Sequence, residues 1–247
     1  NVLNINHTGL GNNLFEISTH LAFCWDNNYN YSFPDINLLY EKVPEYPKNT
    51  IYRNLHIKKY DNYTIIDNRK YFYKYFHKFK NKLNSIFSID DTTLNFINNN
   101  IFININKPTV SMHVRRGDFT FIAKQWNPEY ITKKSYYVEA YNLMKEKLNT
   151  DFHLLIISDD IEWCKQNLIF DDTKYINNLD YIDLWIMTLC DHNIISSSTF
   201  SWWGAYLNKN FEKNIVICPR KSIYKEKKNV DKYNINFYPN NKTNNCK

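Results

Sequence analysis

The sequence contains few residues of the kinds that mark specialised architectures. Its 247 residues include four glycines and seven prolines, too few for a collagen-like or linker-rich protein. The five cysteines are scattered and form no CxxC pair, so we expect free thiols and neither a disulfide framework nor a zinc site. No run of about 18 apolar residues occurs, so we expect no membrane span in this chain.

The chain does contain enough apolar material for a folded core. Hydrophobic residues make up 43% and aromatic residues 17%, which excludes a disordered protein. The formal net charge of +6 is a mild excess that suits a soluble surface, although it would also suit an anionic ligand. We therefore expect a soluble chain, in the cytoplasm rather than in a lumen if the chain is the whole protein.

The C-terminal part alternates short apolar runs with segments of helical periodicity. We expect strands at 109–114, 152–158, 174–176, 192–196 and 214–218, and helices at 134–149, 160–167, 180–190 and 199–207. This alternation is typical of an α/β protein whose parallel sheet carries helices on both faces.

The N-terminal part is less regular. We expect a strand at 2–5, a tight loop at Gly9 and Gly11, a helix from Asn12 to residue 26, and short strands and turns over 28–107. Residues 71–82 interleave aromatic and basic side chains, a pattern that can bind nucleic acid, but an ordinary amphipathic or loop segment explains it better and we expect no nucleic-acid partner. The regular alternation begins after residue 107, so we predict domains at 1–107 and 108–247.

Three polar clusters follow the expected strands at 109–114, 152–158 and 192–196. They are His113-Val-Arg115-Arg116-Gly-Asp118, Ser158-Asp159-Asp160, and Ser196-Ser197-Ser198-Thr199-Phe-Ser201. In an open α/β sheet, ligands bind beyond the carboxyl ends of the strands. The shared placement of the clusters therefore predicts one binding site at that edge.

The arginine pair indicates an anionic ligand. Only five of the 31 basic residues are arginine, and two of these are Arg115 and Arg116. A guanidinium group can bind phosphate or carboxylate with two parallel hydrogen bonds. The alternative is an ion pair with Asp118 that only stiffens the loop. His113 would share the face of Arg115, or would simply be a core histidine.

The other clusters leave similar alternatives. The hydroxyl run at a helix start suits a diphosphate, or only caps the helix. The Gly9–Asn12 loop would let the backbone approach a ligand, or is an ordinary turn; it lacks the third glycine of a dinucleotide fingerprint. Asp159 and Asp160 would bind a metal, accept hydrogen bonds from a nucleotide, or cap a helix; other Asp pairs in the chain need no metal.

These motifs resemble those of the glycosyltransferase family 11 fucosyltransferases, which form α-1,2 linkages from GDP-fucose. HVRRGD at 113–118 resembles the family's HxRRxD signature, SSSTFSWWGAYL at 196–207 its NSTFSWWxAYL block, and GLGNNLFEIS at 9–18 its GLGNQMFQxA segment. The chain departs from the family at Asn13, usually Gln, and at Ser197, usually Asn. Arg220 stands where an aromatic residue is usual, and the tail lacks the usual Trp.

The resemblance implies a GT-B-like architecture with two Rossmann-like lobes, an N-terminal acceptor lobe and a C-terminal lobe that binds GDP-fucose. It implies catalytic roles for Arg115, on the β-phosphate, and for Asp118, a candidate base. It implies donor contacts for a larger set: His113, Arg116, Ser158, Asp159, Asp160, Ser197, Ser198, Thr199, Ser201, Gly9, Gly11 and Asn12.

The implied reaction is transfer of fucose with inversion to a galactoside hydroxyl of a glycan, without metal or cofactor. Two alternatives remain: a glycosyltransferase that uses another nucleotide sugar, and a protein that binds nucleotide sugars or carbohydrates without turnover.

Overall fold

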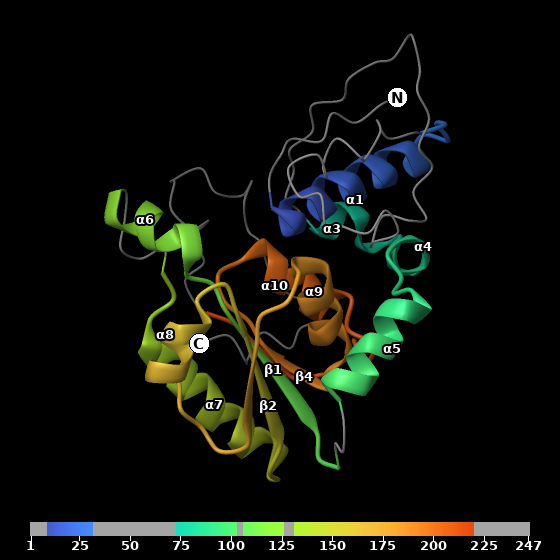
Figure 1. The fold of residues 1–247 in the computed structure, drawn as a ribbon. Coiled ribbons are helices and arrows are strands. Elements are labelled where there is room, and N and C mark those ends of the chain that lie inside the picture. Colours follow the sequence, from blue (N-terminus) through green and yellow to red (C-terminus); the bar gives the residue numbers. More distant parts are fainter. Residues whose placement is uncertain (1–8, 32–72, 103–105, 126–130, 220–247) are drawn as a thin grey trace. The chain divides into compact units, whose positions relative to one another are not determined.

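A computed structural model describes residues 9–31, 73–102, 106–125 and 131–219 of the chain (Figure 1). Contacts divide the chain into two compact units, residues 1–95 and 96–247. We describe each unit by itself. The predicted boundary at residue 107 stays a prediction.

The first unit is helical where it is described. Helix α1 (Leu10–Asp26) is buried along most of its length, and its polar residues Glu16, Ser18 and His20 are buried together with the apolar ones. Helix α3 (Tyr73–His77) packs against α1, and the rings of Phe15 and Phe76 meet edge to face with their centroids 5.8 Å apart. These contacts give the unit an aromatic core.

Two expectations for this unit are wrong. Helix α1 begins at Leu10, so Gly11 lies in its first turn rather than in a loop, while Asn12 is helical as expected. Short strands and turns were expected over 28–107, but α3, α4 (Lys80–Ile86) and α5 (Asp91–Asn100) are helices. Residues 32–72 and 103–105 of that stretch lie outside the described residues. The expected strand at 2–5 lies outside the described residues.

Basic side chains of the aromatic 71–82 segment make contacts within the unit. The Lys78 ammonium pairs with Asp26 at 2.6 Å, and the Lys82 ammonium lies 5.3 Å from the centre of the Trp25 ring. Helices account for the amphipathic pattern of this segment. The absence of a nucleic-acid partner stays a prediction.

The second unit is built on a parallel five-stranded sheet in the order β3-β2-β1-β4-β5. Its strands are β1 (Thr109–Val114), β2 (His153–Ser158), β3 (Thr173–Ile176), β4 (His192–Ile194) and β5 (Val216–Ile217). All five were predicted, with ends that differ by at most a few residues. Residues of β1 are buried throughout, as expected for a strand covered on both faces.

Helices follow the strands and cover the sheet. The predicted ones are α7 (Lys134–Leu148), α8 (Ile161–Asn167), α9 (Asp180–Leu189) and α10 (Thr199–Tyr206). Figure 1 shows α7 and α8 on one side of the sheet and α9 and α10 on the other. Helix α6 (Gly117–Gln125), which directly follows the arginine pair, was not predicted.

The strand order reverses at β1, because β2 and β3 lie on one side of it and β4 and β5 on the other. In open α/β sheets this reversal creates the crevice in which ligands bind, at the carboxyl ends of the strands. A buried Asn193 side chain on β4 fastens β4 to β1 by donating to Ser111 Oγ at 2.7 Å. The residues that follow β1 and β4 are therefore held side by side.

The structure also bears on the expected state of the cysteines and on the expected lack of a membrane span. Cys24, Cys164 and Cys190 are free and buried, but Cys218 is disulfide-bonded, so the expectation of five free thiols is wrong. Each helix within the described ranges is too short or too polar to cross a membrane.

Candidate active site

The structure brings the three predicted polar clusters together at the carboxyl edge of the sheet. The last residue of β1, Val114, pairs in register with Ser158 at the end of β2. The Ser158 hydroxyl donates to the Val114 carbonyl at 2.8 Å and accepts from the Asp160 N–H at 3.0 Å. Ser158 is buried, and its contacts tie the ends of two strands together.

The Arg115 guanidinium group lies between two carboxylates. Its Nη1 donates to Asp159 Oδ2, and its Nη2 donates to Asp118 Oδ1 at 2.5 Å. The ion pair with Asp118, one of the two alternatives left by the sequence, is therefore formed. The Arg115 side chain is still one third exposed, so the ion pairs leave part of it open to a ligand.

The Arg116 side chain turns away from Arg115 and toward α8. Its Nε donates to Asp160 Oδ2 at 3.0 Å, and its guanidinium carbon lies 3.8 Å from the centre of the Trp163 ring. Asp160 also caps α8 by accepting from the Trp163 N–H at 3.2 Å. The geometry gives Arg116 a part in holding α8 in place, and its donor contact stays a prediction.

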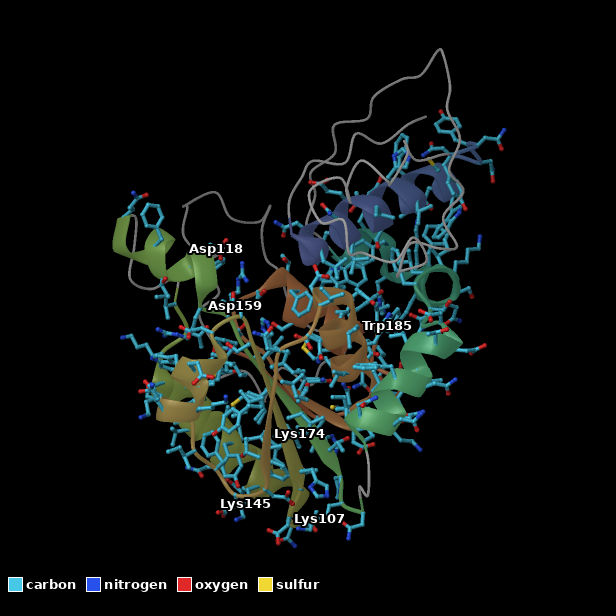
Figure 2. The ribbon with its side chains drawn as sticks, viewed as in Figure 1. Lys107, Asp118, Lys145, Asp159, Lys174 and Trp185 are labelled. Atoms are coloured by element: carbon cyan, nitrogen blue, oxygen red, sulfur yellow. The ribbon has the colours of Figure 1, made fainter. Side chains whose placement is uncertain are left out.

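Asp159, which Figure 2 labels together with Asp118, joins the first two clusters through its contact with Arg115. Besides Arg115, its carboxylate accepts from the Arg116 N–H at 2.8 Å. A Cβ atom on Gly117 would lie 2.5 Å from Asp159 Oδ2, closer than real Cβ contacts come. A side chain at position 117 would therefore have to displace the Asp159 carboxylate, which favours glycine in the HVRRGD motif.

His113 is buried at the end of β1, and its Nδ1 lies 2.9 Å from Ser196 Oγ. Its ring also contacts Phe200, with centroids 5.2 Å apart. Burial lowers the pKa of His113 from 6.5 to about 3; the Asp159 carboxylate opposes this shift and the Arg115 cation adds to it. His113 is therefore a neutral imidazole at physiological pH.

The hydroxyl run caps α10, as one of its alternatives predicted. Ser198 Oγ accepts from the Phe200 N–H at 3.3 Å. The fully buried Ser201 hydroxyl donates to the carbonyls of Ser196 and Ser198 at 3.3 and 3.2 Å. Ser201 thus uses its proton inside the fold, and the geometry favours a positioning role over a phosphate contact.

The remaining members of the predicted site are found in two places. The Ser197 N–H donates to Thr132 Oγ1 at 3.4 Å, and Thr199 begins α10. Gly9 caps α1 in the other compact unit, where Gly11 and Asn12 form the first turn. The donor contacts expected of these residues stay predictions.

Sequence reasoning missed two carboxylates that follow β3 at the same edge of the sheet. Asp183 on α9 is buried and accepts from the Asn178 side chain at 3.0 Å. Burial raises the pKa of Asp183 to about 6, and burial with the neighbouring Asp183 charge raises that of Asp180 to about 6. Acidic residues in the first turn of a helix after a strand were the available signal.

Metal ligands do not gather in the part of the chain that the structure describes: it contains no group of three His, Cys, Asp or Glu side chains that could hold an ion. Asp159 and Asp160 instead face the two guanidinium groups. Metal-independent chemistry stays a prediction.

A family model described as glycosyl transferase family 11 matches residues 31–240. The chain belongs to this family. The resemblance predicted from the HVRRGD and SSSTFSWW motifs is thereby confirmed.

Curated relatives of the chain include glycosyltransferases named for the transfer of colitose and of fucose. An alpha-1,2-colitosyltransferase of Escherichia coli is 35% identical over 63% of this chain and 55% of its own length. The O-antigen biosynthesis glycosyltransferase WbnK of the same species is 33% identical over 55% of this chain and 47% of its own. A galactoside alpha-(1,2)-fucosyltransferase 1 of Leontopithecus chrysomelas is 28% identical over 40% of this chain and 28% of its own length. The chain spans about half the length of the two bacterial relatives.

A solved structure shares the fold. The NodZ alpha-1,6-fucosyltransferase soaked with GDP-fucose matches 83% of this chain and 91% of its own, with a TM-score of 0.50 and 12% identity. With the parallel sheet described above, this likeness supports the α/β, GT-B-like class predicted from the sequence.

The contact between Gly117 and Asp159 generates a stability prediction. Alanine at a helical glycine usually stabilises a protein by up to about 1 kcal/mol. We expect Gly117→Ala instead to lower the free energy of unfolding by about 1–2 kcal/mol, because the new Cβ displaces a carboxylate held by two donors. Urea unfolding of the full chain measures this difference.

The control is Gly9→Ala, because a Cβ at Gly9 meets nothing within 4 Å. Glycine is a better helix N-cap than alanine, so we expect this variant to lose up to about 1 kcal/mol, less than the Gly117 variant. If Gly117→Ala were as stable as the unaltered chain, the Asp159 carboxylate would move aside at no cost, which would contradict the prediction.

Buried, neutral His113 generates a pH prediction. The unfolded chain takes up a proton at this position below pH 6.5, whereas the folded chain does so only near pH 3. The free energy of unfolding therefore decreases as the pH is lowered. The His113 contribution that is lost between pH 7 and pH 5 is about 2 kcal/mol. The measurement compares urea unfolding at these two pH values for the unaltered chain and His113→Asn.

Other titrating groups, including Asp180 and Asp183, are common to both proteins and cancel in the comparison. The variant should show the weaker dependence on pH. The same dependence in both proteins would mean that His113 is not held neutral by the fold.

Proposed function

We propose that the chain transfers fucose from GDP-fucose to a galactoside hydroxyl, forming an α-1,2 linkage with inversion. The observation that carries the proposal is the partly exposed Arg115 at the strand-order reversal, two residues after His113, whose ring contacts Phe200 in the first turn of α10. Membership of glycosyl transferase family 11 and the alpha-(1,2)-fucosyltransferase relatives support it. A GDP leaving group needs such a site, because charge grows on its β-phosphate as the sugar departs.

The ion pairs of Arg115 are compatible with phosphate binding. Asp118 is 60% exposed, and ion pairs at such surfaces are typically worth less than about 1 kcal/mol. A diphosphate offers charge-assisted, bidentate hydrogen bonds, which are stronger. We therefore propose that phosphate replaces Asp118 on Nη2 while Asp159 keeps its hold on Nη1.

This exchange gives Asp118 its proposed second role. Released from Arg115, its carboxylate becomes able to accept the proton of the attacking acceptor hydroxyl as a general base. The positive end of the α10 dipole and Arg115 together stabilise the leaving diphosphate, so the proposed mechanism requires no metal.

The two compact units give the proposal its architecture. We propose that the second unit is the donor lobe, since it contains the arginine pair and the hydroxyl run. The first unit, with Gly9, Gly11 and Asn12, is proposed as the acceptor lobe of a two-lobed GT-B enzyme.

A second candidate function is transfer of colitose. It is favoured by the E. coli relative named alpha-1,2-colitosyltransferase, which is 35% identical. Parallel assays with the GDP-linked forms of fucose and colitose distinguish the two candidates by the donor that is consumed faster.

Arg115→Ala tests the proposed function directly. We expect purified protein to release GDP from GDP-fucose in the presence of a galactoside and EDTA, and the variant to lose about 10²–10³-fold in kcat, as for removal of a donor that stabilises transition-state charge. The matched control is Lys145→Ala, an exposed cation that Figure 2 shows at the opposite end of the sheet from Asp159.

The control variant should retain full activity. A strict need for Mn²⁺, or activity only with a donor other than a GDP-linked sugar, would contradict the proposal. GDP-fucose binding without GDP release for any galactoside would instead favour a protein that binds nucleotide sugars without turnover.

A further inference from the structure

A chain of buried polar groups connects the ends of β1 and β4 to the start of α10. His113 Nδ1 lies 2.9 Å from Ser196 Oγ, and Ser196 Oγ lies 3.5 Å from Ser201 Oγ. All three side chains are at least 96% buried. Ser196 belongs to the hydroxyl run but was not among the residues predicted to contact the donor.

The protons of this chain can be arranged in two ways. In the first, Ser196 donates to Nδ1 of the imidazole, so that the ring proton lies on Nε2. In the second, the Nδ1–H group donates a hydrogen bond to Ser196 Oγ. The Ser196 hydroxyl then donates to Ser201 Oγ, and Nε2 is left as an acceptor. A neutral imidazole carries one ring proton, so the two arrangements exclude each other.

Distances favour the first arrangement. The contact between His113 and Ser196 has ordinary hydrogen-bond length. The second arrangement also needs Ser196 to donate to Ser201 over 3.5 Å, beyond the usual 2.5–3.0 Å of hydrogen bonds between hydroxyl groups. The Ser201 proton itself is directed to backbone carbonyls of Ser196 and Ser198.

We propose that Ser196 is a positioning residue, which holds His113 as the Nε2–H tautomer and so makes the ring a hydrogen-bond donor toward the anionic donor nucleotide. The last part rests on the proposed function. A neutral N–H donor suits this place, since it binds a phosphate oxygen without adding charge beside Arg115. Ser196 acts only through His113 and touches no substrate atom in the proposal.

The tautomer can be measured without any assay of activity. The full chain is labelled with ¹⁵N-histidine, and long-range ¹H–¹⁵N spectra are recorded at pH 7.5, with the His113 signals assigned by their absence in His113→Asn. We expect an unprotonated nitrogen signal for Nδ1 and a protonated one for Nε2. A protonated Nδ1 in the unaltered chain overturns the proposal.

Two variants that each remove one buried hydroxyl separate the arrangements. Ser196→Ala should abolish the single-tautomer spectrum of His113, because Nδ1 loses its donor. Ser201→Ala should leave the tautomer unchanged, whereas a shift of the proton in this variant would indicate the relay through Ser201 and overturn the proposal.

GDP titration measures the consequence for binding. Loss of one hydrogen bond of ordinary strength predicts about tenfold weaker GDP binding by Ser196→Ala. Unchanged binding together with an altered tautomer would overturn the link to the nucleotide. If the unaltered chain binds no GDP at all, the proposed function fails, while the spectra still decide the tautomer.

Discussion

The carboxylate of Asp159 is the contact on which the carboxyl edge of the sheet depends. It accepts from the Arg115 side chain and from the Arg116 backbone, and thereby fastens the loop after β1 to the end of β2. Its approach leaves no room for a Cβ atom at Gly117. The RRGD sequence is therefore one structural unit: Arg115 is held by Asp159 and Asp118, Arg116 is held against α8 by Asp160, and Gly117 admits the Asp159 carboxylate.

Charge in this region is close to balanced, with three carboxylates around two guanidinium groups. The net charge of the chain, +6, thus says little about its ligand. The features on which the proposed diphosphate site rests are local: Arg115 is one third exposed, its partner Asp118 is 60% exposed, and α10 follows β4, the strand beside β1. In that proposal, neutral His113 adds a hydrogen-bond donor without further charge.

The sequence predicts the second unit well, for a physical reason. Strands such as β1 and β2 are buried on both faces, so their apolar runs stand out, and the polar residues at their ends are then readily assigned to one edge. Helix α3 was missed because its five residues are too few to show a helical period. Helices α4 and α5 were missed because they are short and rich in Lys or Asn, so that few positions carry the apolar period. Helix α6 was missed because its first residues were interpreted only as a ligand motif.

Side-chain roles within the site were less predictable than its position. The sequence could not tell that Arg115 and Arg116 point to different elements, because this depends on contacts with residues 44 positions away in the chain. The Ser201 hydroxyl donates to carbonyls only five and three residues before it, but the sequence leaves open whether it does so or faces a ligand. Asp183 could be recognised as an acidic residue in the first turn of a helix, but its burial could not, since burial comes from packing and not from a local pattern.

The most direct test of the central claim, that Arg115 holds the β-phosphate of the donor nucleotide, is a comparison of GDP and GMP affinities by calorimetry. GDP should bind the unaltered chain at least about tenfold more tightly than GMP, because charge-assisted hydrogen bonds to phosphate are worth about 1.5 kcal/mol or more. In Arg115→Ala the ratio should fall toward one, with GMP binding little changed. An unchanged ratio in the variant would contradict the claim.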